Sequence, residues 1–365
     1  MGRKPEARRL LSFPRRRHLE QQPTYVGLDI HKNTIVATAV VPQGRRIDPS
    51  QLTSYGHDLR VCLRALPGDK RVVMEACTFW EHSFDAAASV SSSVVLSHPY
   101  KTRIIAEARV KTDKVDSEAL ATLLRLDAVP EAFAPPPALR QMRDTVKERV
   151  FYLAKEKSVK NHLYAYLMRK GIPYEEGVLG LKKKRETLRE LHNPVVDRAL
   201  DMLAHFDTGT KDLDRAVHGE FERSKEAQLL ATIPGIGEIT AVTLAAYLTP
   251  IERFDNIDQV SAYCGLAPST HQSGDHEFHG HLRSDSHHLL RWILVEAGWK
   301  TRQFEKRGDV AKAGNRSARR HGKGTGAIAA AHKLLKISYA VLRHGTPYQP
   351  HAPEPEGRKV LTADS

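Results

Sequence analysis

Four acidic residues stand in positions where a carboxylate is costly. Asp29 lies at the end of one run of β-branched residues and Glu75 at the end of another, so each carboxyl group adjoins a predicted strand core. A charge beside a core destabilises the fold unless it is paired or holds a cation. Asp113 and Asp116 are three residues apart in a predicted helical segment. They therefore project from one face, where like charges repel.

A divalent metal ion would relieve both costs. Oxygen ligands without a required cysteine or histidine favour Mg²⁺, with Mn²⁺ as the alternative. Two such ions can activate an attacking oxygen and stabilise a leaving one at a phosphodiester. Each acid alone also fits a solvated charge or a helix cap. Together, in the order strand, strand, helix, they predict a metal-dependent site formed by Asp29, Glu75, Asp113 and Asp116.

A serine is the second candidate for chemistry. Ser273 precedes Gly274 in a small, polar segment, which is typical of a functional loop. Its hydroxyl can attack phosphorus if a neighbouring group removes the proton or neutralises the phosphate. Ser269, Ser284 and Ser286 lie close in the sequence and compete for this role. The nearby histidines match no closed zinc-binding pattern.

Candidate phosphate contacts are of two kinds. Gly235 and Gly237 belong to a tight turn between two predicted helices, where free backbone N–H groups at a helix start can receive a phosphate. A plain helix–turn–helix corner is the alternative. Basic side chains can bind the nucleic-acid backbone, and the candidates are Lys32, Lys111, Lys114, Arg283, Arg291, Arg319 and Lys323.

The composition points to a polyanionic partner. The 365 residues include 56 Lys and Arg against 43 Asp and Glu, a formal net charge of +13, which favours nucleic acid or an anionic membrane. No run of 18 apolar residues is present, and the Arg-rich N-terminus lacks the apolar core of a signal peptide. The three cysteines stand far apart, which favours a reducing cytoplasm over a disulfide framework.

The elements that must position these residues follow from the hydrophobic pattern. We expect strands over 25–30, 34–41, 71–75 and 94–96, the first two as a hairpin, and helices over 51–66, 78–89 and 104–126. This order predicts an α/β domain with a mixed sheet. The proline run at 135–137 marks its end.

We expect five segments in all. Residues 1–23 form a flexible basic arm, and residues 24–134 form the α/β domain. Residues 138–225 contain two long, charged helices with narrow apolar seams, which favours a coiled coil used for oligomerisation, with a plain helical spacer as the alternative. Residues 226–348 form a compact, mostly helical domain, and residues 349–365 form a tail.

Several motifs together resemble the DEDD transposases, insertion-sequence recombinases with a RuvC-like fold. In the first half these are Gly27-Leu28-Asp29-Ile30-His31-Lys32, Met74-Glu75-Ala76, Ser97-His98-Pro99 and Lys111-Thr112-Asp113-Lys114-Val115-Asp116. In the second half they are Ile233-Pro234-Gly235-Ile236-Gly237, Tyr263-Cys264-Gly265-Leu266-Ala267-Pro268, Gln272-Ser273-Gly274, Leu290-Arg291-Trp292-Ile293-Leu294-Val295-Glu296-Ala297 and Ala331-His332-Lys333-Leu334-Leu335. The likeness covers about residues 24–348, and the motifs follow the order of that family.

The resemblance implies an RNase H-like (RuvC-like) N-terminal domain, a helical coiled-coil insertion and a mostly α-helical C-terminal transposase domain with a helix-hairpin-helix-like element. It implies that Asp29, Glu75, Asp113 and Asp116 bind Mg²⁺ and that Ser273 forms a transient phosphoserine link to DNA. Acids and serine would act in one composite site assembled between subunits of a homodimer or tetramer. Members of this family use a structured RNA, the bridge RNA, which pairs with donor and target DNA.

We therefore expect a cytoplasmic DNA transposase that cuts and exchanges strands at the ends of an insertion sequence and at its target, guided by RNA. One alternative is a RuvC-like, structure-selective endonuclease that uses two metal ions and water as the nucleophile. The other is a non-catalytic RNA- or DNA-binding protein that uses the glycine turn and the basic surfaces.

Overall fold

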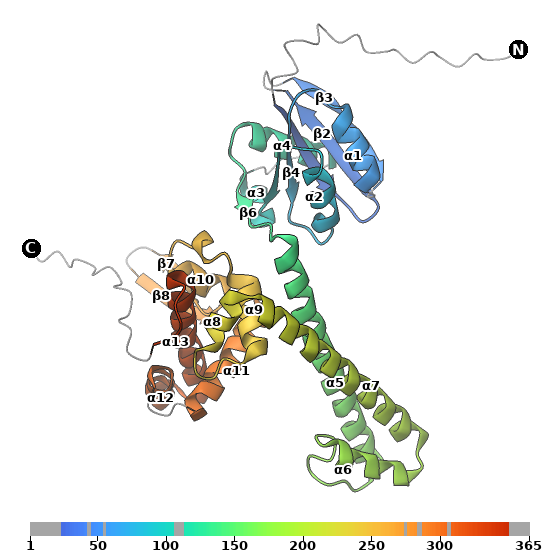
Figure 1. Cartoon of the computed structure of the whole chain (residues 1–365), viewed down its shortest axis with the longest axis vertical. Coiled ribbons are helices and arrows are strands. Elements are labelled where there is room, and N and C mark those ends of the chain that lie inside the picture. The colour runs from blue at the N-terminus through green and yellow to red at the C-terminus, as the bar shows by residue number, and fades with distance from the viewer. Residues whose placement is uncertain are drawn as a thin grey trace, which may run out of the picture. The chain divides into compact units, whose positions relative to one another are not determined.

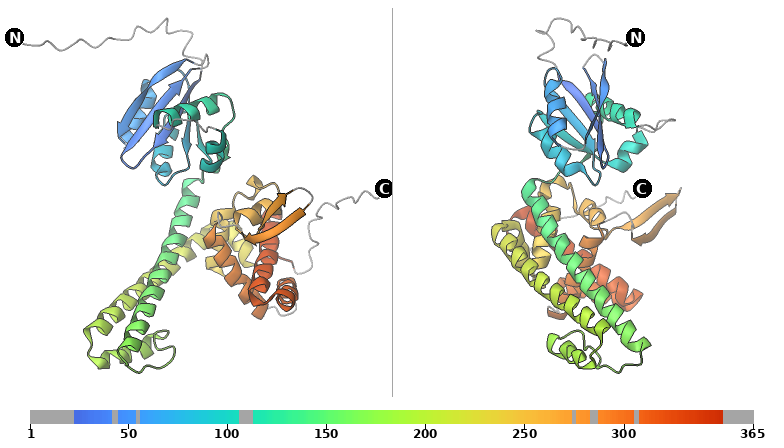
Figure 2. Two further views of the ribbon diagram at one scale, coloured as in Figure 1. Left: turned by 180° about the vertical axis from the view of Figure 1, so that it is seen from behind. Right: turned by 90° about the vertical axis from the view of Figure 1, so that its right-hand side faces the viewer.

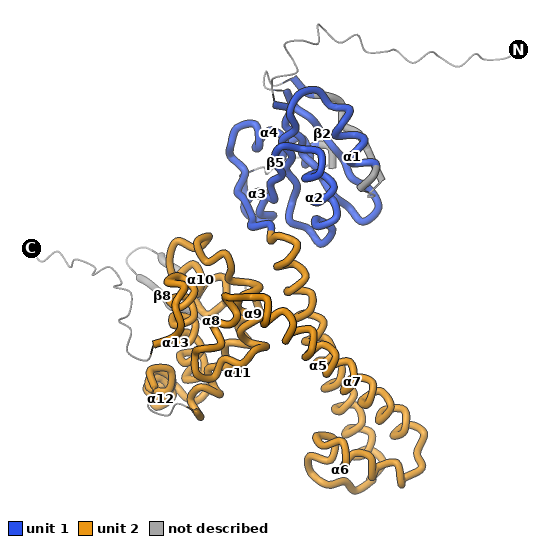
Figure 3. Tube along the Cα trace, viewed as in Figure 1, with its two compact units in different colours: residues 1–134 blue, residues 135–365 orange. Residues whose placement is uncertain are grey.

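The chain folds into two compact units, Met1–Ala134 and Pro135–Ser365 (Figure 3). The computed structural model describes residues 23–41, 45–53, 56–105, 113–273, 276–282, 287–304 and 308–349 (Figure 1). The expected basic arm, but for residue 23, and the expected tail, but for residue 349, lie outside these ranges.

The first unit is built on a mixed six-stranded sheet in the order β3-β2-β1-β4-β5-β6. Its strands are β1 (Thr24–Ile30), β2 (Thr34–Val40), β3 (Arg46–Thr53), β4 (Lys70–Glu75), β5 (Ser93–Ser97) and β6 (Glu131–Ala132). The antiparallel pairing of β1 with β2 confirms the predicted hairpin. Strands β1, β4 and β5 run parallel at the centre of the sheet, so the mixed α/β class is also confirmed.

Helices cover both faces of this sheet (Figure 2). Helices α1 (Gly56–Ala65) and α2 (Trp80–Ala88) pack on the face formed by alternate residues of β1, including Val26 and Leu28. Helix α4 (Asp113–Arg125) covers the opposite face, where a Cβ added at Gly27 would lie 1.9 Å from the Ser117 carbonyl oxygen. Helix α3 (Pro99–Ile105) follows β5 directly.

Two predicted boundaries in this unit are wrong. The helix expected from residue 51 begins at residue 56, because residues 46–53 pair with β2 as the edge strand β3. The helix expected over 104–126 has a different start, because residue 104 already belongs to α3, which begins at Pro99; α4 covers Asp113–Arg125. Proline at the first helical position is compatible with a helix start.

The second unit opens with two long helices, α5 (Pro137–Arg169) and α7 (Pro194–Arg223), which pack side by side as a hairpin (Figure 1). A Cβ added at Gly209 would lie 2.2 Å from the Tyr152 ring, so glycine permits the close approach. The short helices α6 (Lys182–Glu186) and η2 (Thr187–Leu191) close the hairpin end over a separate small core that includes Leu163, Leu179 and Leu200.

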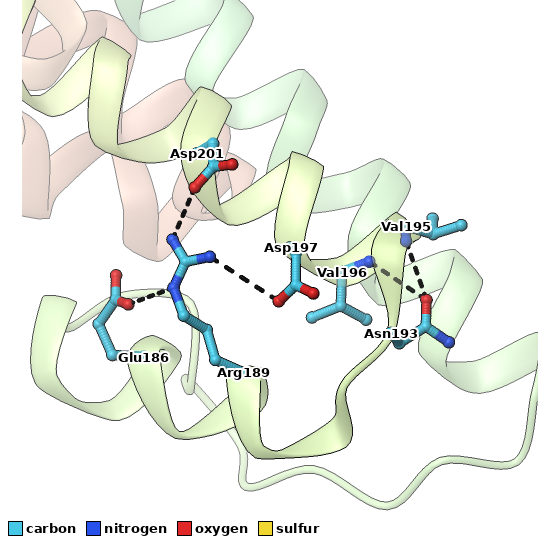
Figure 4. Close-up of polar contacts among 7 residues, drawn as sticks. All are labelled: Glu186, Arg189, Asn193, Val195, Val196, Asp197 and Asp201. Carbon is cyan, nitrogen blue, oxygen red and sulfur yellow. Dashed lines mark hydrogen bonds and ion pairs between the residues drawn. The ribbon is translucent and has the colours of Figure 1, made fainter.

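Polar contacts fix the start of α7 (Figure 4). The Asn193 side chain accepts hydrogen bonds from the backbone N–H groups of Val195 at 2.9 Å and Val196 at 3.4 Å, which caps the helix. Arg189 of η2 donates to Glu186 at 2.7 Å and to Asp201 of α7 at 2.8 Å, and lies 3.7 Å from Asp197. The connection between α6 and α7 is therefore held by both a cap and an ion-pair network.

The rest of the second unit is mostly helical, as the sequence predicts. It contains α8 (Lys225–Ala231), α9 (Glu238–Leu248), η3 (Ile251–Arg253), α10 (Ile257–Tyr263), α11 (His288–Phe304), α12 (Asp309–His321) and α13 (Lys323–His344). Helix α9 is buried along its whole second half and forms the centre of the core. Within the described ranges, no helix is both long and apolar enough to cross a membrane.

One expected loop is a β-hairpin. Residues around Ser273 form β7 (Pro268–Ser273), which pairs antiparallel with β8 (His276–Leu282). The sequence did not predict strands there because the segment is polar and has no apolar alternation.

Candidate active site

Asp29 and Glu75 occupy neighbouring positions on parallel strands. The register pairs Leu28 of β1 with Met74 of β4, and each acid is the next residue along its strand. Neighbours in a parallel register point to the same side of the sheet. The two carboxylates therefore lie side by side at the carboxyl edge of the sheet.

Helix α4, which contains the two remaining acids, packs on the same face of the sheet. Asp29 shares its side of β1 with Gly27, on which α4 packs. The Ser117 hydroxyl of α4 makes a buried hydrogen bond of 2.7 Å with the Thr38 hydroxyl of β2, which anchors the helix there. Asp116 directly precedes Ser117 and is half-buried, and Asp113 begins the helix one turn earlier. The Asp113 side chain lies outside the described part of the chain.

Electrostatics at this edge agree with the close placement of the first two acids. Burial is the main cause that raises the pKa of the Cys77 thiol, and the negative charges of Glu75 and Asp29 both raise it further. The Cys77 thiol also lies 3.9 Å from the Ile30 carbonyl oxygen. A His31 ring nitrogen lies 3.2 Å from the Asp29 carboxylate, whose side chain is only 17% exposed. A cation at this edge would lower the electrostatic cost of the paired carboxylates.

The donor set fits a hard divalent cation. Carboxylate oxygens from Asp29, Glu75 and Asp116 are the ligand type that Mg²⁺ prefers. Among the side chains that the structure describes, no three acids, histidines or cysteines are grouped closely enough to form a metal site by themselves. Asp29, Glu75 and Asp116 therefore do not form a complete metal site by themselves, and the Asp113 side chain lies outside the described part.

Ser273 is the last residue of β7 and pairs in register with His276 across the hairpin tip. Its side chain and those of Ser269 and Gln272 lie outside the described part, as do Gly274, Ser284 and Ser286 entirely. The serine thus stands at the tip of a two-stranded arm.

An aromatic stack that the sequence did not reveal contains Tyr263, five residues before β7, and His287, five residues after the end of β8. His287, directly before α11, lies 4.9 Å from the Tyr247 ring and 4.9 Å from the Tyr263 ring. The guanidinium of Arg143 lies 4.6 Å from the Tyr247 ring, and that of Arg253 lies 4.8 Å from the Tyr263 ring. Its members come from five separate parts of the unit, so no local motif signals the stack.

The surroundings of His287 in this stack keep its ring neutral. Burial is the main cause that lowers the pKa of His287 to about 4, and the positive charges of Arg143, Lys147, Arg253 and His288 add to it. His287 is therefore neutral near pH 7. The two arginines are held by α9, because Arg143 donates to the Ala246 carbonyl at 2.8 Å and Arg253 to the Tyr247 carbonyl at 2.6 Å.

The glycine turn has two different glycines. Gly235 has a positive φ of 87°, and a Cβ there would lie 2.1 Å from the Thr301 hydroxyl oxygen of α11, so its position is set by packing. Gly237 begins α9 as its N-cap, is exposed, and would have no atom within 4 Å of an added Cβ. Glu238 follows it and pairs with His218 at 3.1 Å. Gly237 alone of the two keeps the exposed backbone that phosphate contact needs.

The basic candidates are distributed over both units. Lys32 is exposed just after β1, Arg319 and Lys323 are exposed at the junction of α12 and α13, and Arg291 is half-buried in α11. Lys114 belongs to the first turn of α4, but its side chain is outside the described ranges. Lys111 and Arg283 lie wholly outside them.

Comparisons with known proteins match both halves of the chain. Residues 26–171 match a transposase family of the DEDD, IS110 type, and residues 227–313 match the family described as transposase IS116/IS110/IS902. The transposase for insertion sequence element IS1328 of Yersinia enterocolitica is 26% identical over 88% of this chain and 98% of its own length. The transposase for IS1111A of Coxiella burnetii is 24% identical over 79% and 80%. The pilin gene-inverting protein of Moraxella bovis is 25% identical over 89% and 97%.

Proposed function

We propose that this protein is an RNA-guided transposase that cuts and exchanges DNA strands through a phosphoserine intermediate. The chain carries domains of the IS110/IS116 transposase family, which imply DNA transposition. Its N-terminal unit is an RNase H-like domain that holds Mg²⁺ on Asp29, Glu75, Asp113 and Asp116. Its second unit supplies Ser273 as the nucleophile. The active form is a homodimer or tetramer that uses the α5–α7 hairpin for assembly.

One observation carries the proposal. Asp29 and Glu75 follow the paired residues Leu28 and Met74 on adjacent parallel strands, and α4, which begins with Asp113, packs on the same face. A fold has no structural need for three acids at one sheet edge, since like charges repel there. Phosphodiester chemistry with a divalent cation gives the arrangement a use.

The proposed reaction balances without a further reactant. The Ser273 hydroxyl oxygen forms a bond to phosphorus while the bond from phosphorus to a sugar oxygen breaks, and the serine proton ends on that departing oxygen. A sugar hydroxyl from the partner strand then attacks the phosphoserine and returns the proton to the serine. Mg²⁺ on the four acids would supply positive charge for the oxygen that departs.

Nucleic-acid binding is supported by charge and by the relatives. A net charge of +13 favours polyanions, and the relative from Moraxella bovis is named for inverting a gene. We propose that structured RNA encoded beside the gene selects the DNA sites. Sequencing the nucleic acid that co-purifies with the protein tests this part. A discrete RNA from the flanking DNA is expected, and random cellular RNA would contradict it.

The test of the chemistry is a covalent adduct. The protein with its co-purified RNA is incubated with labelled DNA that contains the element end and with Mg²⁺, and is then run on a denaturing gel. We expect a protein–DNA adduct for the unchanged protein, none for Ser273→Ala, and an undiminished adduct for the matched control Ser269→Ala. Loss of the adduct in Ser269→Ala alone would move the nucleophile to Ser269.

The two alternatives predict different outcomes. If Ser273→Ala cleaves DNA at the full rate and no adduct forms in any variant, water is the nucleophile and the protein is a RuvC-like endonuclease. If Asp29→Asn and Asp113→Asn both leave strand exchange intact, the acids have no catalytic role and a binding function gains support.

A further inference from the structure

We propose that Phe79 and Tyr100, which follow the ends of β4 and β5 beside the acid site, stack on unpaired bases of the DNA strand next to the phosphodiester that is cut. This inference rests on the proposed function, because it takes DNA as the substrate of that site. It assigns a base-binding role to two residues that lie next to the acids in the fold but belong to none of the motifs for metal or nucleophile.

Both aromatic residues leave the sheet at the edge that carries the acids. Phe79 lies four residues after Glu75, and its backbone interacts with the Cys77 thiol, which itself lies in the field of Asp29 and Glu75. Tyr100 lies three residues after Ser97, which pairs in register with Glu75. A backbone hydrogen bond of 3.1 Å from Ala76 to the Ser97 carbonyl joins the two strand ends.

Both rings face solvent although each adjoins a packed core. The exposed fraction is 46% for Phe79 and 63% for Tyr100, and neither side chain belongs to the hydrophobic core of the first unit. The neighbouring Trp80, by contrast, packs against that core and against Phe84 at 5.5 Å. The chain therefore places one aromatic residue inward and the preceding one outward at the same strand end.

The basic side chains around Tyr100 favour a nucleic acid rather than a protein as the binding partner. Every residue of α3 except Thr102 is exposed, and the helix contains Lys101 and Arg103 but no acid. The Arg103 guanidinium lies 5.8 Å from the Tyr100 ring centre. Aromatic rings interleaved with basic side chains are the pattern that binds single strands, with the rings on the bases and the cations at the phosphates. Ile104, 60% exposed, extends the apolar side of the same short helix.

Unpaired bases are the form of DNA that fits. A base inside a duplex offers no open face for stacking, whereas strand exchange must expose bases at the cut. Stacking on an aromatic side chain strengthens the binding of single strands about 5- to 100-fold per base. Two rings at the ends of β4 and β5 would hold bases next to the phosphate at the acids.

The test measures binding by the full-length protein in the presence of EDTA, so that no cleavage is needed. The probes are one fluorescein-labelled 20-nucleotide DNA strand, its duplex and an RNA strand of the same sequence. We expect Phe79→Ala and Tyr100→Ala each to weaken binding of the single DNA strand about tenfold and duplex binding less than twofold. Phe79→Tyr and Tyr100→Phe should restore binding. Phe304→Ala, which removes a 78% exposed ring from α11, is the control and should change nothing.

Two readouts distinguish base stacking from a change in charge or a protein interface. A 2-aminopurine in the strand should be quenched by the unchanged protein and not by the alanine variants, and the salt dependence of binding should stay the same because no charge is removed. Equal losses for strand and duplex, or a loss for RNA alone, would overturn the proposal. The proposal would also be overturned if the alanine variants changed the mass of the protein in light scattering without changing DNA binding, because that result would show a protein interface. Failure of the Ser273 adduct would leave this assay unaffected, so the two proposals fail separately.

Discussion

Asp29 interacts with three other groups of the first unit. It adjoins Glu75 across the strand pair, lies 3.2 Å from a nitrogen of His31, and acts on the Cys77 thiol. Its carboxylate is largely covered, so its charge is weakly screened. A residue of this kind influences chemistry through charge rather than through shape.

Replacing Asp29 by Asn tests that view because it keeps the shape and removes the charge. We expect DNA cleavage to fall at least about 100-fold, while circular dichroism shows a folded protein. Glu118→Gln is the matched control, since Glu118 is another carboxylate of the first unit but belongs to α4 and pairs at 2.5 Å with Arg46 of β3. A similar loss in the control would show that any lost charge near α4 has this effect.

His287 gives the second unit a dependence on pH. Its pKa is lowered from 6.5 to about 4, mainly by burial. Between these two values the unfolded chain binds a proton that the folded protein does not, so stability present above pH 6.5 is lost as the pH falls. We expect about 2 kcal/mol of unfolding free energy to be lost by pH 4, less than the full shift implies because the ring is partly exposed.

Urea unfolding of the full-length protein at pH 7.5 and pH 4.5 measures this loss. His287→Phe keeps a ring between Tyr247 and Tyr263 and should lose less stability on acidification than the unchanged protein. His218→Gln is the control with the opposite sign: the hydrogen bond that His218 donates to the Glu238 carboxylate raises the pKa of His218, so removing this histidine should steepen the loss. If the two variants behave alike, His287 is not the group responsible.

At the scale of elements, the acids depend on how closely α4 approaches the sheet. A Cβ at Gly27 would lie 1.9 Å from the Ser117 carbonyl oxygen and 2.6 Å from the Ala121 backbone nitrogen. Neither atom can move without moving the helix. The close packing therefore requires glycine, and it holds the part of α4 that follows Asp116 against β1.

Gly27→Ala should push α4 away from β1. We expect a loss of about 1–3 kcal/mol in unfolding free energy and a loss of cleavage larger than that of stability, measured by urea unfolding and by the DNA adduct. Gly324→Ala is the control, because no atom lies within 4 Å of a Cβ there and the residue is helical. It should stabilise the protein by up to about 1 kcal/mol. Unchanged stability of Gly27→Ala would contradict the close packing.

Comparing the elements with the sequence shows which of them could be predicted. The β-branched runs of β1, β2, β4 and β5 predicted strands because such residues favour a pleated, half-buried surface, and an acid at a strand end stood out against them. Strand β3 was missed because its polar sequence, with Pro49, pairs only as an edge to β2. The stack around His287 was missed because it joins residues that are far apart in the chain.

At the scale of the whole molecule, the acids of the proposed site belong to a chain with a net charge of +13. In the second unit, α12 packs against α13 so closely that a Cβ on Gly326 would lie 2.7 Å from the Gly314 carbonyl oxygen. The opposite face of α12 exposes Arg316, Arg319 and Arg320. A rigid helix that presents several arginines to solvent is suited to contact successive backbone phosphates.

The double variant Arg319→Ala/Arg320→Ala tests that surface. Each phosphate contact releases about one counterion from DNA, so the slope of log Kd against log salt should decrease by about 2 in the double variant, with similar loss for unrelated DNA sequences. Fluorescence anisotropy with the full-length protein across a salt series measures the slope. Arg215→Ala is the control, because Arg215 is 80% exposed but pairs with Asp212 on α7. An unchanged slope in the double variant, or an equal change in the control, would show that net charge rather than α12 holds the DNA.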